Sequence, residues 1–484
     1  MIATIFKKST LYAIGTAARA ATSIIMLPIY TRYLTPDVYG TAELLNIILD
    51  LTVLLLGAQI TGGVFKFYSD AGSKKEKNTV VSTAIWLGLL VNVVGIILLW
   101  LSAPFLASAL GSSELTLALR WFSFTLAFAT ITELGMGYYR VNDMAGSFLM
   151  VSLAKLAIQI AANVYFIVFL EMGLWGIIYS ALLAGSVQAA WLAYNIIPKV
   201  GVYFSISKAK ELAVFGLPLV FGSIAMYYIT FADRYYLQYF HDATSVGLYA
   251  LSYKFGFMLL ALVWAPFMSY WGAKQFDHAK EDDGAALFGR VFEVANYILW
   301  LAATGMLLFA SPIIRFIADA SYFQSIEYIP YIVMAYVFLG WTEFHRFGIF
   351  ESKRTYLLNR INWFSVLIVS VAYISLIPNY GGGGAALATL LVMAVRFVVI
   401  YHYAQKYYSF YTPWFKVLSL YLLTSVVFYL CSSLYVNNVY DFILSAIAVI
   451  VAVIASFICK ASPITIPELT AYWKISFKNK MQKM

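Results

Sequence analysis

The sequence predicts an all-α membrane protein of about fourteen transmembrane helices, arranged as two six-helix lobes followed by two further helices. Of its 484 residues, 62% are hydrophobic and 11% are charged, and the mean hydropathy is +0.81. These values lie outside the range of soluble globular domains. Apolar runs of about 18 or more residues recur along the chain, and a helix of that length can cross about 30 Å of hydrocarbon.

The apolar runs place the individual helices. The first run holds Arg19 near its middle and has full membrane length, so we expect it to remain as a helix rather than to be a cleaved signal. The predicted spans are residues 9–31, 40–64, 79–103, 115–138, 146–170, 172–198, 212–232, 245–271, 289–311, 326–348, 358–378, 382–405, 413–433 and 437–460.

The charges in the connections predict the orientation. With the N-terminus inside, the even-numbered connections and both termini hold 19 Lys and Arg, whereas the odd-numbered connections hold three, Arg32, Arg234 and Arg315. Positive residues are retained on the cytoplasmic side of membrane proteins. We therefore expect a multi-pass protein of the bacterial inner membrane with both termini cytoplasmic. The formal charge of +9 reports this topology, and no nucleic-acid partner is expected.

Two sequence matches at nearly one offset indicate an internal duplication. Gly40 and Gly247 follow similar segments and lie 207 positions apart, and Gly176 and Gly384 lie 208 apart. An offset of six helices gives both copies the same orientation, as in transporters whose halves are related by an axis along the membrane normal. The alternative is a chance likeness of glycine-rich turns. The predicted domains are an N-lobe (1–198), a cytoplasmic linker (199–211), a C-lobe (212–405), helices thirteen and fourteen (406–460) and a basic cytoplasmic tail (461–484).

Polar residues recur on single faces of several predicted spans. An ionised side chain at the bilayer centre costs about 3 kcal/mol, so these faces are expected to line a hydrated cavity rather than to meet lipid. The stripes are Tyr12, Thr16, Arg19 and Ser23 in helix one; Glu43, Asn46 and Asp50 in helix two; Lys155, Gln159 and Asn163 in helix five; and Ser223, Tyr227 and Thr230 in helix seven. Lys254 in helix eight and Arg396 in helix twelve add two further intramembrane cations.

Each intramembrane charge also has a structural interpretation, because opposite charges at similar depth can form ion pairs. The candidate pairs are Arg19 with Asp50, Arg120 with Glu43, Lys155 with Glu133, and Arg396 with Glu343. Helix eight is rich in aromatic residues, which can stack on sugars but also form the aromatic belts of membrane proteins. The belt interpretation is favoured at the ends of the spans.

Several chemistries lack their sequence signals. The chain has no G-x-x-x-x-G-K-[ST] loop for a nucleotide and no G-x-S-x-G elbow for a nucleophile. The four histidines lie on separate segments, so no metal site is predicted, and no cofactor is expected. Cys431 and Cys459 lie in apolar helices, where neither a disulfide framework nor a metal site is plausible. The outward connections are too short for a catalytic domain.

The chain resembles the polysaccharide exporter family, the Wzx-type flippases of O-antigen and capsule repeat units in the multidrug/oligosaccharidyl-lipid/polysaccharide superfamily. The resemblance covers nearly the whole chain and rests on residues 27–36 with Tyr39 and Gly40, on 215–218, on 233–235 before 246–249, and on 380–381 with 384–389. It implies a MATE/MOP-like fold with V-shaped lobes, alternating access, and undecaprenyl-pyrophosphate-linked oligosaccharide as substrate. By position it also implies that Arg19 and Lys254 hold the pyrophosphate.

The resulting hypothesis is a flippase that carries the lipid-linked repeat unit from the inner to the outer leaflet. The residues expected to bind the substrate are Arg19, Asp50, Lys155, Gln159, Asn163, Tyr227, Lys254 and Arg396. Membrane potential, H⁺ or Na⁺ could drive it, and membrane lipids, a polysaccharide polymerase and a chain-length regulator are the expected partners. The alternatives are a drug or cation antiporter of the same superfamily and a membrane-embedded glycan polymerase or ligase. The sequence leaves the sugar, the coupling ion and the oligomeric state open.

Overall fold

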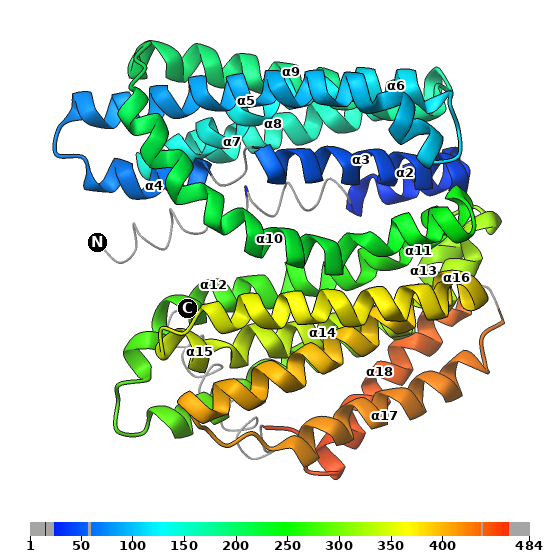
Figure 1. Cartoon of the computed structure of the whole chain (residues 1–484). Helices are drawn as coiled ribbons and strands as arrows, with labels where there is room; N and C mark the ends of the chain where they lie inside the picture. The colour runs from blue at the N-terminus through cyan, green and yellow to red at the C-terminus, as the bar shows by residue number, and fades with distance from the viewer. Residues whose placement is uncertain (1–14, 16–23, 57–59, 437–438, 464–484) are drawn as a thin grey trace, which may run out of the picture. The chain divides into compact units, whose positions relative to one another are not determined.

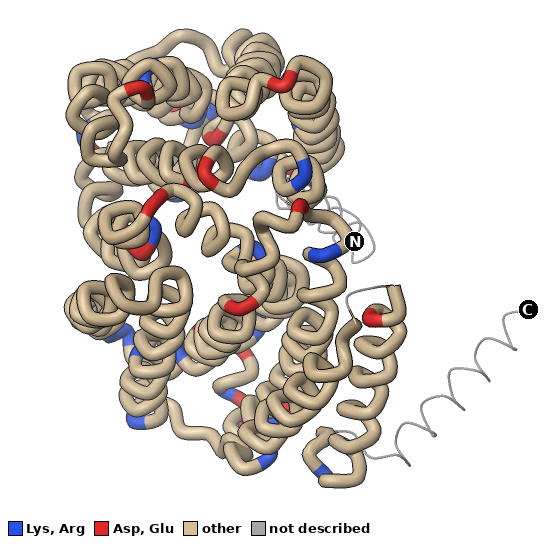
Figure 2. Tube along the Cα trace, turned by 90° about the vertical axis from the view of Figure 1, so that its right-hand side faces the viewer, with Lys and Arg blue, Asp and Glu red and all other residues tan. Residues whose placement is uncertain are grey.

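The computed structural model describes residues 15, 24–56, 60–436 and 439–463 of the chain (Figure 1). In this part of the chain every regular element is a helix, which confirms the predicted all-α class. Charged residues appear in Figure 2 as short, scattered bands on a mostly uncharged trace. This distribution agrees with the low charged fraction of 11% and with the long apolar runs.

The contacts within the chain divide it into two compact units. Unit 1 comprises Met1–Leu251 and Asn362–Ala388, and unit 2 comprises Ser252–Ile361 and Thr389–Met484. All three boundaries, after Leu251, Ile361 and Ala388, cut through helices. The units therefore follow contacts and do not test the predicted domain limits, which remain predictions.

Unit 1 contains the helices of the first half of the chain and parts of two later ones. Its described elements are α2 (Leu27–Tyr33), α3 (Pro36–Leu56), α4 (Ile60–Asp70), α5 (Lys74–Ala109), α6 (Leu115–Ser123), α7 (Leu126–Val141), α8 (Ala145–Asn163), the π-helix η1 (Val164–Phe169), α9 (Gly173–Val200), α10 (Ile206–Phe240), the start of α11 (Ala243–Leu259) and the middle of α16 (Tyr356–Tyr407).

Unit 2 contains the rest of α11 and α16 together with the later helices. These are the π-helix η2 (Leu260–Trp264), α12 (Ala265–His278), α13 (Gly284–Ile317), the 3₁₀ helix η3 (Ala320–Tyr328), α14 (Ile329–His345), α15 (Phe347–Glu351), α17 (Trp414–Ser432) and α18 (Tyr440–Ile458). Asp319 begins η3, because its Oδ1 accepts a hydrogen bond from the Ser321 nitrogen at 2.9 Å.

Ten of the described helical segments are long and apolar enough to cross a membrane, or eleven when the two bent halves of α10 are taken as one span. The predicted first span lies mostly outside the described residues. The predicted eleventh and twelfth spans form one element, α16, of 52 residues with a break at Gly381. The predicted tenth span corresponds to α14, which has 17 residues. The remaining predicted spans each match one of the segments, so the chain is a multi-pass membrane protein.

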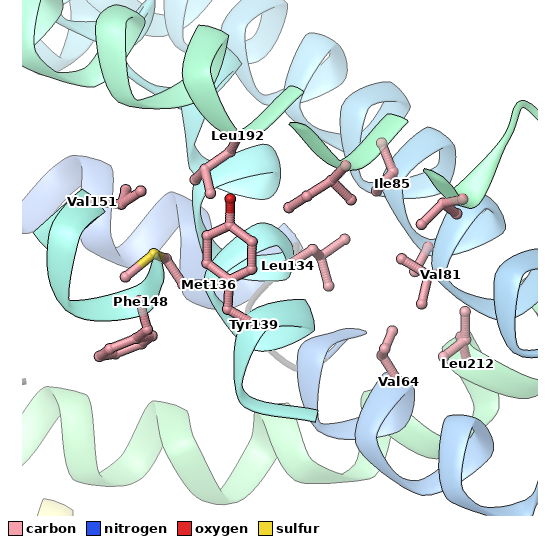
Figure 3. Packing of buried hydrophobic residues seen from close by; sticks show 13 residues of the cluster. Val64, Val81, Ile85, Leu134, Met136, Tyr139, Phe148, Val151, Leu192 and Leu212 are labelled. Carbon is pink, nitrogen blue, oxygen red and sulfur yellow. The ribbon is translucent and has the colours of Figure 1, made fainter. Parts of the chain in front are cut away.

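A buried hydrophobic cluster joins six helices of unit 1. In lipid, helices associate by close van der Waals packing rather than by the hydrophobic effect, so small residues at the crossings matter. Gly135 allows such an approach, because a Cβ at this position would lie 3.2 Å from Leu192 on α9. The cluster, seen in Figure 3, includes Val64, Val81, Leu134, Phe148, Leu192 and Leu212.

The segment between α9 and α10, part of the predicted linker, is tied to α5. Ser82 is buried and its hydroxyl donates to the Gly201 carbonyl at 3.0 Å, while the Tyr203 nitrogen donates to the same hydroxyl at 2.8 Å. The Ser205 nitrogen donates to the Thr83 hydroxyl at 3.1 Å. Consecutive side chains at the start of α5 therefore hold this connection along its length.

The two segments of the second sequence match, around Gly176 and Gly384, also share a backbone geometry. Gly173 has φ = +52° and Gly381 has φ = +51°, and these residues are 208 positions apart, the same offset as Gly176 and Gly384. Positive φ favours glycine because it has no Cβ. In each copy the glycine begins a helix after a break, η1 to α9 in the first copy and within α16 in the second.

Candidate functional site

The α3 helix carries a polar face through an otherwise apolar span. Glu43, Asn46 and Asp50 are spaced so that they share this face, and Asn46 and Asp50 are exposed whereas Glu43 is half-buried. The Asn46 amide donates to the Ala42 carbonyl of its own helix at 2.9 Å. A carboxylate and an amide exposed within a membrane span require an aqueous or polar surrounding.

The α10 helix meets this face with tyrosines. The Tyr227 hydroxyl donates to the Ile47 carbonyl of α3 at 2.5 Å, and Asp50 interacts electrostatically with both Tyr227 and Tyr235. The structure therefore brings together two of the predicted site residues, Asp50 and Tyr227. It also adds Tyr235, which sequence analysis missed although it lies two turns from Tyr227 on the same face of the helix.

The predicted polar face of α8 divides into an accessible part and a buried part. Lys155 and Gln159 are half-buried. Asn163 is fully buried, and its Oδ1 accepts a hydrogen bond from the Ser180 hydroxyl of α9 at 2.5 Å. This bond gives Asn163 a structural role in joining α8 to α9. The substrate contacts assigned to these three residues remain predictions.

A buried charged network at the end of α10 was not among the predicted sites. Asp233 and Arg234 are 0% and 3% exposed, and the Arg234 guanidinium bonds to Asp233 at 2.7 Å. The other Asp233 oxygen accepts the Tyr249 hydroxyl of α11 at 2.6 Å, and Arg234 also donates to the Thr230 carbonyl at 2.7 Å. The network joins α10 to α11 by charge-assisted hydrogen bonds.

The placement of Arg234 corrects the predicted connections. We expected Arg234 in an outward loop after a span ending at residue 232, but α10 continues to Phe240 and buries it. Arg32 and Arg315, the other two residues assigned to outward connections, also lie within helices, α2 and α13. The prediction from hydropathy ended the span at the first charged residues. The helix continues past them, because the carboxylate of Asp233 neutralises the buried charge of Arg234.

Two predicted cations belong to unit 2. Arg396 on α16 is buried, and the charged groups that act on it are Glu343 and Arg346 of α14. Glu343 itself forms an ion pair with Arg346 at 2.5 Å. The expected neighbour of Arg396 is therefore present, but it is shared with a second arginine. Lys254 on α11 is half-buried.

Other expectations for charged residues have mixed outcomes. Arg19 lies outside the described residues, so its role and its expected pairing with Asp50 remain predictions. The Arg120 guanidinium stacks over Trp100 at 5.3 Å and donates to its carbonyl at 3.4 Å. Glu133 is exposed on α7. Among the described residues, no group of three His, Cys, Asp or Glu could hold a metal ion.

The aromatic residues of the predicted helix eight fall into two groups. Tyr249, Tyr253, Trp264 and Trp271 are buried, and Trp271 stacks on Phe344 with 5.8 Å between ring centroids. Phe267 is half-buried, while Phe257 and Tyr270 are 37% and 67% exposed. Core packing therefore accounts for most of the aromatic residues of this helix that suggested stacking on sugars. The cysteines differ similarly, since Cys431 is buried and Cys459 is exposed at the end of α18.

Comparison with protein families gives one match along most of the chain. A family model described as "Polysaccharide biosynthesis protein" matches residues 29–327, more than half of the sequence. A comparison with curated protein sequences gave no match.

The fold is similar to that of solved membrane transporters. The lipid II flippase MurJ in an inward closed conformation superposes with a TM-score of 0.72 at 14% identity, over 92% of this chain and 98% of that chain. An inward-facing multidrug resistance MATE family transporter of the MOP superfamily gives 0.64 at 16% identity, over 82% and 94%. A MOP superfamily transporter from Pyrococcus furiosus gives 0.52 at 14% identity, over 83% and 95%. These likenesses establish the MATE/MOP-like fold.

Proposed function

The chain belongs to the polysaccharide biosynthesis protein family, and from this premise we propose that it is a flippase for lipid-linked oligosaccharides. Its substrate would be an undecaprenyl-pyrophosphate-linked repeat unit for O-antigen or another surface polysaccharide. The protein would lie in the bacterial inner membrane with both termini in the cytoplasm. It would act as a transporter rather than an enzyme, by alternating access.

The polar face of α3 is the observation that carries the proposal. Asn46 and Asp50 are exposed within a span of the required length and hydropathy, and Asp50 interacts electrostatically with Tyr227 and Tyr235 of α10. Hydroxyl, amide and carboxylate groups are suited to hydrogen bonds with sugar hydroxyls. A transporter that moves a polar head group through the bilayer needs such a surface.

The pyrophosphate would be attracted by the intramembrane cations Arg19 and Lys254, and the prenyl chain would remain in the lipid. A membrane potential that is negative inside favours outward movement of an anion by about 2.3 kcal/mol per charge per 100 mV. For a doubly charged head group this amounts to roughly 5 kcal/mol, so the potential alone could drive export. The alternative driving force is coupling to H⁺ or Na⁺ through Asp50 or Glu133.

The first rival is a drug or cation antiporter. It is favoured by the likeness to the MATE transporter and by two carboxylates, Glu43 and Asp50, on the polar face of α3. The Pyrococcus furiosus protein is described by a reversed polarity of its binding pocket that suggests a different function. Cavity charge is therefore the property that separates the proposals, with net positive charge favouring the flippase. A polymerase or ligase is disfavoured by the short connections between the described helices.

Deletion of the gene tests the proposal directly. We expect lipid-linked repeat units to accumulate on the inner leaflet and surface polysaccharide to be lost, with both restored by the wild-type gene. Normal surface polysaccharide in the deletion strain, together with loss of resistance to cationic drugs, would support the antiporter instead.

Substitution of single cations tests the charge assignment. We expect Lys254→Gln and Arg19→Gln each to lower export at least tenfold at matched protein levels, because each removes a positive charge from the path of the pyrophosphate. Lys280→Gln is the matched control, since Lys280 is exposed in the turn after α12. Export that stays at the wild-type level in both cation variants would refute the assignment.

A further inference from the structure

Two glycines of unit 1 pack backbone against backbone where α3 and α11 begin. A Cβ added to Gly40 would clash with the Ala243 carbonyl oxygen and lie 2.7 Å from the Gly247 nitrogen. A Cβ added to Gly247 would clash with the Pro36 carbonyl oxygen and lie 3.1 Å from the Gly40 nitrogen. No side chain larger than hydrogen fits at either position while the two helices keep this distance.

The contact is reciprocal. Gly40 and Gly247 are 207 positions apart, and so are Pro36 and Ala243. Gly40 therefore packs against the Ala243 carbonyl, and Gly247 packs against the equivalent Pro36 carbonyl. Such a reciprocal contact is typical of an interface between two copies related by a two-fold axis.

The start of α11, which carries Gly247, is held by hydrogen bonds to its own cap and to α10. Asp242 caps α11 by accepting a hydrogen bond from the Ser245 nitrogen at 2.7 Å, and Tyr249, two residues after Gly247, bonds to the buried Asp233. Near the end of α10, the Gln238 amide donates to the Leu110 carbonyl at 2.7 Å. The first two bonds fix the start of α11 to its own cap and to α10, so they oppose a local shift of α11 away from the glycine contact.

We propose that the Gly40–Gly247 contact is the seal that closes the outer end of the substrate path. The proposal rests on alternating access in the proposed function and on the predicted topology, which places the starts of both helices on the outer side. Release of a large head group to the outer leaflet then requires the two helix starts to separate. Glycine at both positions lets the path close, because two backbones in contact leave no gap for water or ions.

Accessibility of a single cysteine behind the contact tests the proposal. Asn46 is exposed on α3, between one and two turns beyond Gly40. In a chain carrying Cys431→Ala and Cys459→Ala, Asn46→Cys is treated with a membrane-impermeant maleimide in right-side-out and in inverted membrane vesicles. With both glycines present, we expect labelling at least tenfold faster in inverted vesicles. Rapid labelling in right-side-out vesicles would overturn the proposal without any glycine substitution.

Substitution of the glycines provides the second test. Gly40→Ala and Gly247→Ala should each raise labelling in right-side-out vesicles at least tenfold, to similar extents, and the double variant should add little because both changes separate the same contact. Gly305→Ala is the matched control, since a Cβ there meets nothing within 4 Å. Folded glycine variants that stay within twofold of the native rate would overturn the proposal. If the glycine variants do not fold, the proposal is decided by the first test, which compares labelling of Asn46→Cys in the two kinds of vesicle with both glycines present. The labelling does not depend on the transported substrate, so it stands apart from the gene-deletion test.

Discussion

Removal of the Asp233 carboxylate should destabilise the protein more than removal of any single neutral hydrogen bond within its spans. Asp233 is fully buried and accepts three hydrogen bonds, two from Arg234 and one from Tyr249, at distances of 2.6 to 2.9 Å. In Asp233→Asn, the ion pair between Asp233 and Arg234 is lost while Arg234 remains buried. Breaking a buried pair in this way costs about 3–5 kcal/mol.

The Tyr249→Phe variant separates the hydrogen bond from the charge. It removes one hydrogen bond to an ionised group, which contributes about 1.5–3 kcal/mol. A neutral hydrogen bond between membrane helices averages only about 0.6 kcal/mol. We therefore expect the unfolding free energy to fall in the order wild type, Tyr249→Phe, Asp233→Asn.

Equilibrium unfolding in detergent micelles measures these differences. Tyr270→Phe is the matched control, because Tyr270 is 67% exposed and its variant should stay within about 0.5 kcal/mol of the wild type. If Tyr249→Phe matched the control and Asp233→Asn cost no more than Tyr249→Phe, the carboxylate could not be the centre of a buried ionic network, and the reasoning would be refuted.

Three further changes have defined expectations. Gly381→Ala places a Cβ on a residue with φ = +51° and should lower the unfolding free energy by about 1–2 kcal/mol, measured by thermal melting beside the control Gly305→Ala. Asn296→Leu should cost about 1–3 kcal/mol, because the buried donors of Trp341 and Tyr421 lose their shared acceptor; an unchanged melting temperature would contradict it. The hydrogen bonds at the start of η3 hold the pKa of Asp319 below its ordinary value of 3.8, so their stabilisation is present above that pH and is lost as the pH falls through the lower folded-state pKa. The protection factors of the η3 amides, which correct for the intrinsic pH dependence of exchange, should then fall below about pH 4 in the wild type, whereas in Asp319→Asn they should show no such fall.

The sequence was sufficient to predict the helical class and most spans, because hydropathy over about 18 residues reports membrane burial directly. It was less informative about where helices end. Arg234 stopped a predicted span eight residues before α10 ends at Phe240, since the adjacent carboxylate that permits its burial is invisible to a hydropathy average. The two helices within α16 were separated correctly by their glycines, because the backbone leaves the helical conformation at Gly381.

Residue spacing predicted which polar groups share a helical face but not what each face meets. The α3 stripe was found from its spacing, yet its approach to Tyr227 and Tyr235 depends on how α10 crosses α3. Asn163 illustrates the opposite case: its spacing placed it with Lys155 and Gln159, but the Ser180 hydroxyl that occupies it comes from the next helix. Partners on other helices follow from packing, which a single sequence does not display.

The attachment of the α9–α10 connection to α5 has a consequence for how the chain tolerates cleavage and insertion. The hydroxyls of Ser82 and Thr83 form hydrogen bonds with backbone groups of residues 201–205, so this stretch is not a flexible linker. A protease that reaches this stretch should cut it slowly. Flexible residues inserted there would remove those bonds rather than merely lengthen a spacer. Epitope tags and split points in this chain are therefore better placed elsewhere.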